Sequence, residues 1–162
     1  MELFLVRHAI ALPLGGSDGP PTDSERPLSP LGRERFASAV WALRVMGVRL
    51  KRVEHSPLLR AVQTAELLKP LLDGPMEVSP DLVSPPDAAM LTRLRTDGTA
   101  LVGHEPWMSG LLAQLCGGSG YGVRFAKGAV AWLEGEPVPG GMQLRALWPA
   151  KTLALLRESS AP

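Results

Sequence analysis

Short apolar runs alternate with helical segments along most of this chain, and this alternation constrains the fold more than any other feature. Apolar runs predict strands over residues 2–6, 52–55, 76–78 and 99–104. A segment with helical spacing follows each run, over about residues 30–46, 57–68, 86–96 and 106–117. Such a succession is typical of a parallel sheet that is covered by helices.

The pattern changes after residue 128. Residues 129–134 and 142–147 alternate apolar and polar side chains, and the stretch EPVPGG between them supplies the turn of a hairpin. A short helix over about residues 150–158 closes the chain. We therefore predict an α/β fold, a three-layer α/β/α sandwich whose mostly parallel sheet ends in a C-terminal antiparallel hairpin. We expect one domain over residues 1–162.

The first predicted helix has clear end signals. Ser29 is the expected N-cap, Pro30 suits the first helical position, and Gly47 suits the C-terminal end. Ser56-Pro57 opens the second helix with the same chemistry. The apolar face of the first helix is expected to contain Leu31, Ala39, Leu43 and Met46.

Composition excludes several classes of function. The net charge is +1, so no global basic field favours nucleic acid or an anionic membrane as a partner. The chain has no apolar run of about 18 residues that would predict a transmembrane helix, and its start is a poor signal peptide. The single cysteine, Cys116, cannot form an internal disulfide, which favours a reducing, cytoplasmic location. Its side chain is expected in the core.

Basic and imidazole side chains follow three of the predicted strands at the point where each ends. Arg7 and His8 come after the first strand, and His104 comes after the fourth. Arg60 lies in the first turn of the helix that follows the second strand. Because ligands of open α/β sheets bind beyond the carboxyl ends of the strands, we expect these side chains to converge. Two helix N-termini add positive dipole ends there, so the sequence predicts a local anion site.

A phosphoryl group is the anion that suits this site best. The planar fork of arginine holds two phosphate oxygens at once. His8 can act as a nucleophile that forms a covalent intermediate, and nearby arginines lower its pKa and so keep the ring neutral. The same guanidinium groups would repel a divalent cation, so no metal and no cofactor is expected at His8 and His104.

Three ordered motifs now carry a resemblance to a known family. The runs LVRHAIA, SPLLRAVQTAELL and LVGHEPWMS resemble the histidine phosphatase superfamily, whose fold is phosphoglycerate-mutase-like. The match is closer to its small phosphohistidine phosphatases of the SixA type. The matching residues are Arg7, His8 and Ala11, then Asp23, Arg26, Pro27, Leu28 and Ser29, then Ser56, Pro57, Arg60, Gln63 and Thr64, then Val102, Gly103 and His104, and Lys127, Gly128 and Ala129.

The resemblance implies a role for each matched position in the site. His8 would carry the phosphoryl group, and Arg7, Arg60 and His104 would complete the phosphate pocket. The carboxylic acid that larger members carry after the third strand has no clear counterpart, since Asp87 is more simply a helix N-cap.

Asp23 is the best remaining candidate for the proton donor, and the alternative for Asp23 and Arg26 is a salt bridge within the loop or a cap. It lies in the long loop over residues 12–30, which can fold back over the site, and Arg26 could orient it. Ser56 is first an N-cap and secondly a phosphate contact, and Arg26 is a further candidate for binding the substrate. Among the neighbours, Glu105 is expected to favour a helix dipole, His55 and Thr64 to pack, and Lys127 to lie at the rim.

The sequence therefore predicts a phosphatase that acts through a covalent phosphohistidine on His8. By resemblance, its substrate is phosphohistidine on a signalling protein, such as a phosphotransfer domain. A phosphatase of small phosphate esters is the first alternative. A non-catalytic module that binds phosphohistidine is the second, although binding alone would not need His8.

Overall fold

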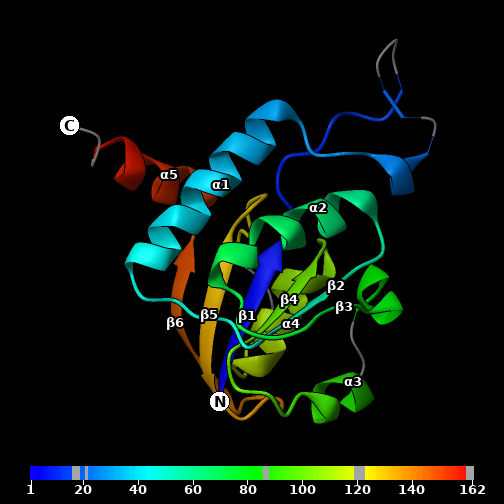
Figure 1. The fold of residues 1–162 in the computed structure, drawn as a ribbon. Helices are drawn as coiled ribbons and strands as arrows, with labels where there is room; N and C mark the ends of the chain where they lie inside the picture. Colours follow the sequence, from blue (N-terminus) through cyan, green and yellow to red (C-terminus); the bar gives the residue numbers. More distant parts are fainter. Residues whose placement is uncertain (16–18, 21, 86–87, 119–122, 160–162) are drawn as a thin grey trace.

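The computed structural model describes residues 1–15, 19–20, 22–85, 88–118 and 123–159, and a six-stranded mixed sheet forms its centre (Figure 1). The strands are β1 (Glu2–Arg7), β2 (Arg52–His55), β3 (Met76–Val78), β4 (Thr99–Gly103), β5 (Val130–Gly135) and β6 (Met142–Trp148). Their order across the sheet is β3-β2-β4-β1-β5-β6. The first four strands pair in parallel, whereas β5 is antiparallel to both β1 and β6. The predicted hairpin on a mostly parallel sheet is confirmed.

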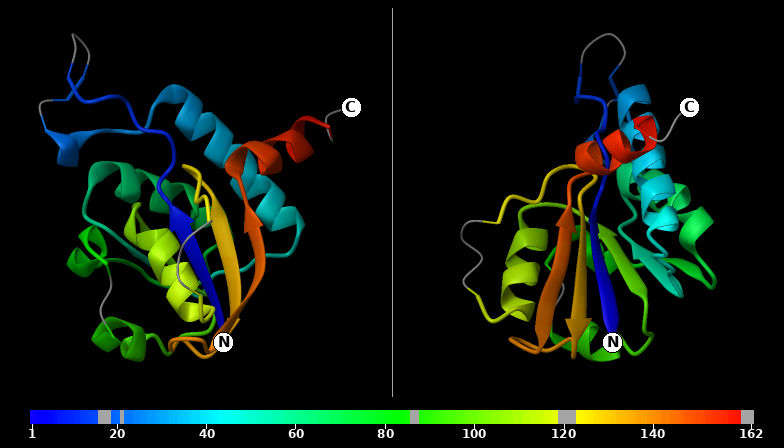
Figure 2. Two further views of the ribbon diagram at one scale, coloured as in Figure 1. Left: turned by 180° about the vertical axis from the view of Figure 1, so that it is seen from behind. Right: turned by 90° about the vertical axis from the view of Figure 1, so that its left-hand side faces the viewer.

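Helices cover both faces of this sheet, as the two views in Figure 2 show. One face carries α1 (Pro30–Val45), α2 (Leu59–Leu67) and α5 (Ala150–Glu158). The other carries α3 (Ala88–Arg93) and α4 (Trp107–Leu115). Short 3-10 turns are η1 (Asp23–Glu25), η2 (Lys69–Leu71) and η3 (Pro80–Val83). The predicted three-layer α/β/α arrangement is therefore confirmed.

The central strand β1 is buried on both faces, which explains its continuous apolar run. Phe4 and Val6 point into the core beneath α1 and α2, whereas Leu3 and Leu5 point into the core beneath α4. Successive side chains of a strand alternate between faces, so this one strand connects the two cores. The central position of β1 fixes where the residues after Arg7 emerge.

The capping chemistry of α1 is as predicted, but part of its predicted apolar face is wrong. Ser29 Oγ accepts a hydrogen bond from Gly32 N at 3.0 Å, and Gly47 follows the helix with a φ of +87°. Leu31 and Met46 are 52% and 45% exposed. The core face is centred on Phe36, and at about 100° per residue Leu31 lies about 140° away from it.

Three further local expectations need correction. Helix α2 begins at Leu59, later than predicted, and its N-cap is Leu58, so the prediction of Ser56 as the N-cap is wrong. Cys116 is exposed, since it forms the C-cap of α4 where the helix leaves the core. Helix α3 ends at Arg93, before the predicted Thr96. Its predicted start at Pro86-Asp87, and with it the proposed cap Asp87, lies outside the described residues.

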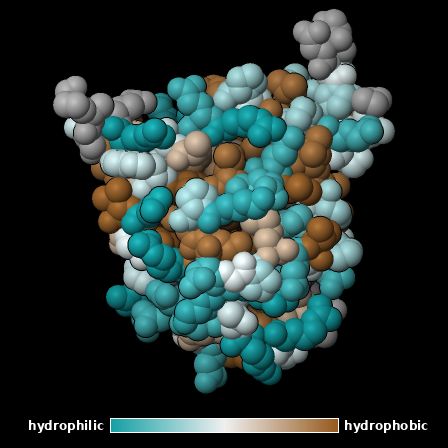
Figure 3. Space-filling model, viewed as in Figure 1, coloured by the Kyte–Doolittle hydropathy of each residue, from teal (hydrophilic) through white to brown (hydrophobic). Residues whose placement is uncertain are grey.

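The surface mixes hydrophilic and hydrophobic residues on the face shown in Figure 3. Exposed apolar side chains come from separate elements, such as Leu31 of α1, Val78 of β3 and Leu155 of α5. Scattered exposure of this kind is normal for a folded protein. Within the described part of the chain, no helix has the length and apolar character needed to cross a membrane.

Candidate active site

The carboxyl ends of β1, β2 and β4 meet at one edge of the sheet. The register pairs Arg7 with Gly103 and His55 with Val102, so the residues that follow these strands emerge side by side. The rings of His8 and His104 lie with their centroids 5.1 Å apart and their planes at 50°. Both imidazoles and Arg60 are more than nine-tenths buried. The structure thus brings together the four residues that the sequence placed at this edge.

His8 is held by its backbone and by its ring. Its N–H donates to the Gly103 carbonyl at 3.0 Å, and its own carbonyl accepts from Gly128 N at 3.0 Å. Ring Nδ1 lies 2.7 Å from the Ala9 carbonyl oxygen. A carbonyl can only accept, so Nδ1 carries the proton and Nε2 has a free lone pair.

Burial keeps this ring neutral. It lowers the pKa of His8 to about 3, and the neighbouring His104, Arg60 and Arg7 act in the same direction. The arginines named from the sequence therefore contribute, but burial is the larger cause. A ring that is unprotonated at neutral pH, with its lone pair on Nε2, is the form that a nucleophile requires.

His104 is paired on one side only. Its Nε2 lies 2.8 Å from Ser56 Oγ, and Ser56 Oγ also accepts from Leu58 N at 3.3 Å. The hydroxyl has one proton and two lone pairs, so it can accept from Leu58 N and donate to Nε2, and in that tautomer the ring proton of His104 is on Nδ1. That Nδ1 is buried and has no partner among the described residues. Burial and the charge of Arg60 lower the pKa of His104 to about 4.

Arg7 and Arg60 each have a guanidinium donor without a hydrogen-bond partner among the described residues. Arg7 Nη1 donates to the Phe125 carbonyl at 2.6 Å, and Arg60 Nη1 donates to the Asp23 carbonyl at 2.6 Å. The Nε atoms of both are buried, and neither has a partner within the described part of the chain. Buried polar groups normally have hydrogen-bond partners, so unsatisfied guanidinium donors beside two neutral imidazoles indicate a place for an anion.

Asp23 comes to the site from η1 and bridges two arginines. Its carboxylate lies 2.9 Å from Arg60 Nη2 and 2.9 Å from Arg26 Nη1. Arg26 in turn donates through Nε to the Leu12 carbonyl at 2.7 Å. The hydrogen bond from Arg26, followed by that from Arg60, lowers the pKa of Asp23 despite an opposing effect of burial. The carboxylate is therefore ionised at neutral pH and occupies part of the Arg60 fork.

Comparison with known proteins identifies the family of this chain. The model of the histidine phosphatase superfamily (branch 1) matches residues 3–83. The phosphohistidine phosphatase SixA of Escherichia coli is 34% identical over 127 residues, which cover 73% of this chain and 76% of that protein. The chain belongs to the histidine phosphatase superfamily.

Solved structures agree with this assignment. A structure of the protein histidine phosphatase SixA complexed with tungstate superimposes with a TM-score of 0.76 at 28% identity, over 94% of this chain and 99% of that one. The SixA-type resemblance and the predicted fold are therefore confirmed. The mitochondrial serine/threonine-protein phosphatase PGAM5 of Mus musculus is 33% identical over 82 residues, but this chain spans only 27% of its length. Family membership supports phosphatase activity, and thus a hydrolase.

One contact of this phosphatase fold was missed by the sequence reasoning. Thr64 was expected only to pack, yet its Oγ1 accepts from Ala9 N at 3.0 Å and donates to the Arg60 carbonyl at 2.6 Å. It thereby ties the segment after His8 to α2. The Gln-Thr pair of the second motif was the available signal. Gln63 Oε1 accepts from Leu28 N at 2.8 Å and anchors the same long loop.

Two neighbouring residues have structural partners. Glu105 Oε2 accepts from Ser109 N at 3.2 Å and so caps α4, and it also opposes the lowering of the Arg7 pKa that burial causes. His55 is buried, and its Nδ1 lies 2.9 Å from the Ser56 carbonyl oxygen. Among the residues described, no group of three or more His, Cys, Asp or Glu side chains is placed to hold a metal ion.

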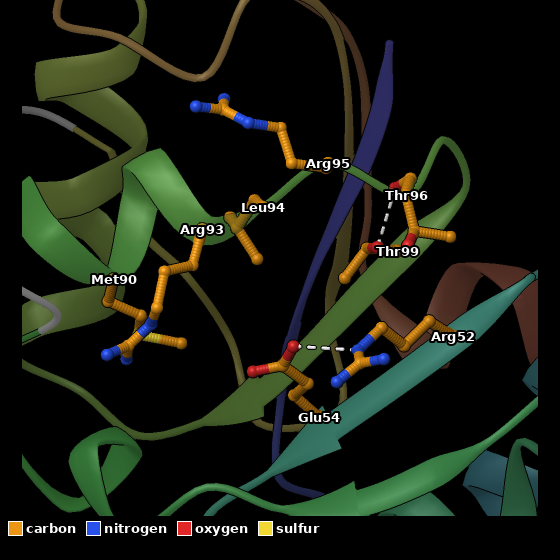
Figure 4. A pocket seen from close by; sticks show the side chains of 8 residues that line it. All are labelled: Arg52, Glu54, Met90, Arg93, Leu94, Arg95, Thr96 and Thr99. Carbon is orange, nitrogen blue, oxygen red and sulfur yellow. Dashed lines mark hydrogen bonds and ion pairs between the residues drawn. The ribbon is translucent and has the colours of Figure 1, made fainter.

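A cavity of about 250 Å³ lies at the other end of the strands (Figure 4). Arg52 and Thr99, which line it, are the first residues of β2 and β4. Arg52 pairs with Glu54 at 2.9 Å, and Thr99 Oγ1 donates to the Thr96 carbonyl at 2.6 Å. None of the described residues that line this cavity has a buried side-chain donor without a partner, unlike Arg7 and Arg60 at the histidine edge, so we do not assign the chemistry to it.

Proposed function

We propose that this protein removes phosphoryl groups through a covalent phosphohistidine on His8, and that its substrate is phosphohistidine on a signalling protein such as a phosphotransfer domain. The observation that carries the proposal is the state of the His8 ring. Nδ1 is engaged by the Ala9 carbonyl, and Nε2 is free beside two guanidinium groups with unsatisfied donors.

The first step forms a bond between His8 Nε2 and phosphorus while the bond from phosphorus to the substrate nitrogen breaks. The electron pair of the broken bond returns to that nitrogen, and the substrate ring, protonated on its other nitrogen, leaves as a neutral imidazole. As the ring shares its lone pair it becomes positive, and the Nδ1–H···O=C bond to Ala9 stabilises that charge. Arg7 and Arg60 stabilise the equatorial oxygens, where charge is spread in phosphoryl transfer. Water then attacks phosphorus, and His8 leaves as the neutral ring.

His104 assists as a neutral donor. In the tautomer in which Ser56 donates to Nε2, the Nδ1–H of His104 has no partner among the described residues and can bind a phosphoryl oxygen. Ser56 thereby acts by orienting the ring. A protonated His104 is not needed for this role, which agrees with the pKa of about 4.

The assignment of Asp23 changes with this geometry. The sequence made it the candidate proton donor, but two arginines hold its carboxylate in the ionised form. A carboxylate with a lowered pKa is a poor general acid. We propose instead that Asp23 positions Arg60 until the phosphoryl group arrives, with Arg26 anchoring the loop. The leaving nitrogen of phosphohistidine needs less acid assistance than an alkoxide does.

The first alternative is hydrolysis of small phosphate esters, and the likeness to PGAM5 supports an oxygen leaving group. The deciding experiment compares kcat/KM for a phosphohistidine-bearing phosphotransfer protein with that for p-nitrophenyl phosphate. Preference for the protein supports the proposal, and faster turnover of the ester supports the alternative. Tight binding of the phosphoprotein without turnover of either substrate identifies a binding module.

A further inference from the structure

A second cavity, of about 410 Å³, opens beside the active site and shares Arg7 with it. Its other cations come from separate elements: Arg35 from α1, Arg124 and Lys127 from the segment before β5, and Lys151 from α5. No Asp or Glu is among the described residues that line it. We call this cavity the basic pocket.

The charge of the basic pocket is not neutralised from within the described protein. None of Arg35, Arg124, Lys127 and Lys151 forms an ion pair with another described residue. At the opposite edge, by contrast, two of the three arginines that line the cavity are ion-paired, Arg52 with Glu54 and Glu77 and Arg93 with Asp81. Since the whole chain carries a net charge of only +1, the basic pocket is a local concentration of charge.

The placement of Lys151 increases this field. It is the second residue of the nine-residue helix α5, and the first turn of that helix holds no acidic residue. A helix N-terminus carries a partial positive charge, so a lysine is unfavourable there without an anion nearby. The positive end of α5 and the four side chains without ion pairs therefore all attract an anion into the basic pocket.

Exposure distinguishes the class of anion. Arg124, Lys127 and Lys151 are exposed, and Arg35 is half-buried. A site that encloses a small anion buries its donors, as the site around Arg60 does. Exposed cations around an open cavity are instead typical of the polar rim of a protein interface, where complementary charges guide association.

We infer that the basic pocket binds acidic side chains of the phosphorylated protein substrate, next to the phosphohistidine held at His8. The inference rests on the proposed function and adds a recognition rule to it. Arg7 joins the two sites, because it lines the basic pocket and its Nη1 donates to the carbonyl of Phe125, another lining residue. An acidic segment adjoining the phosphohistidine would reach both sites at once.

The test uses two phosphohistidine peptides that differ only in flanking residues, Asp and Glu in one and Asn and Gln in the other. We expect the wild-type protein to favour the acidic peptide about tenfold in kcat/KM at low salt, mainly through KM. The double variant Lys127→Glu/Lys151→Glu should abolish or reverse this preference. Its kcat/KM for p-nitrophenyl phosphate should stay within about twofold, because neither lysine belongs to the catalytic machinery.

The matched control is Lys51→Glu/Lys69→Glu, which changes the net charge equally at two exposed lysines away from the basic pocket. It should keep the preference for the acidic peptide. An equal loss of preference in both double variants, or a preference that survives Lys127→Glu/Lys151→Glu, would overturn the inference.

One further arm separates this inference from the proposed function. If neither peptide is hydrolysed while p-nitrophenyl phosphate is, the proposed substrate is wrong. Binding of the acidic peptide, measured by fluorescence anisotropy, then tests the basic pocket alone, since only Lys127→Glu/Lys151→Glu should weaken it. The remaining outcome is that inorganic phosphate binds the basic pocket while Lys127→Glu/Lys151→Glu changes the binding of neither peptide. In that case the pocket binds a small anion and the inference is wrong.

Discussion

The two edges of the sheet use arginine in different ways. At the amino edge, Arg52 pairs with carboxylates, and it contributes to the fold as an exposed or half-exposed ion pair. At the carboxyl edge, Arg7 and Arg60 keep buried Nε donors that have no partner within the described residues. Leaving such donors unsatisfied costs stability, so their presence beside His8 favours an anion as the binding partner of this edge.

The largest expected effect is the loss of activity on substitution of His8, compared with the same substitution of its structural analogue His55. Both are buried, and both place Nδ1 against the next carbonyl oxygen. Only His8 is expected to carry the phosphoryl group, so His8→Ala should lower kcat on the order of 10³-fold or more. His55→Ala should keep most of the activity of the folded protein. Activity above about a tenth in His8→Ala would contradict covalent catalysis there.

The second largest expected effect is the difference in kcat/KM between an arginine-to-lysine substitution at the carboxyl edge and one at the amino edge. Arg60→Lys keeps the charge but loses the bidentate fork, and each charge-assisted bond contributes about 1.5–3 kcal/mol. We therefore expect a tenfold to hundredfold loss in kcat/KM. Arg52→Lys should leave kcat/KM unchanged. The measurement is steady-state kinetics with circular dichroism as the control of folding, and similar losses in both variants would remove the distinction between the edges.

Asp23→Asn tests whether the Asp23 carboxylate positions Arg60 or supplies a proton. If it positions Arg60, we expect a similar, modest loss of about threefold to tenfold in kcat/KM for phosphohistidine and for an ester. General acid help is typically worth about 10²–10⁴-fold where it is needed. A loss of that size confined to the ester would restore Asp23 as the proton donor.

The last expected effect concerns stability against pH and not catalysis. In the folded protein the pKa of His8 is about 3 and that of His104 about 4, below the ordinary 6.5. Below pH 6.5 the unfolded chain therefore binds more protons, and the free energy of unfolding falls as the pH drops toward 4. Each histidine contributes a slope of at most about 1.4 kcal/mol per pH unit. Urea unfolding between pH 7.5 and 5 should show this slope, and His104→Gln should reduce it.

Much of the fold was predictable because local chemistry and topology agree. The βα alternation predicts the layers, and strand ends in a parallel sheet share an edge, so the sequence alone places Arg7, His8 and His104 together. Ser29 capped α1 as expected because its partner, Gly32 N, lies only three residues away. Signals that act over a few residues are readable in a single sequence.

The remaining features depend on contacts between distant segments. Asp23 reaches Arg60 across 37 residues, through a loop whose path no periodicity predicts. The link from Thr64 to Ala9 spans 55 residues. Leu31 was misplaced because an apolar side chain does not by itself show which face of a helix packs on the sheet, and Leu31 lies about 140° around the helix from the core residue Phe36. These errors concern how the loop and the helix ends lie over the edge of the sheet.

The most direct test of the central claim is the position of the trapped phosphoryl group. The protein is mixed with a phosphohistidine substrate, quenched in alkali, and analysed by mass spectrometry and phosphorus NMR. Because Ala9 engages Nδ1, we predict the phosphoryl group on Nε2 of His8. Phosphate on Nδ1 of His8, on His104, or on no residue during rapid-quench turnover would contradict the account.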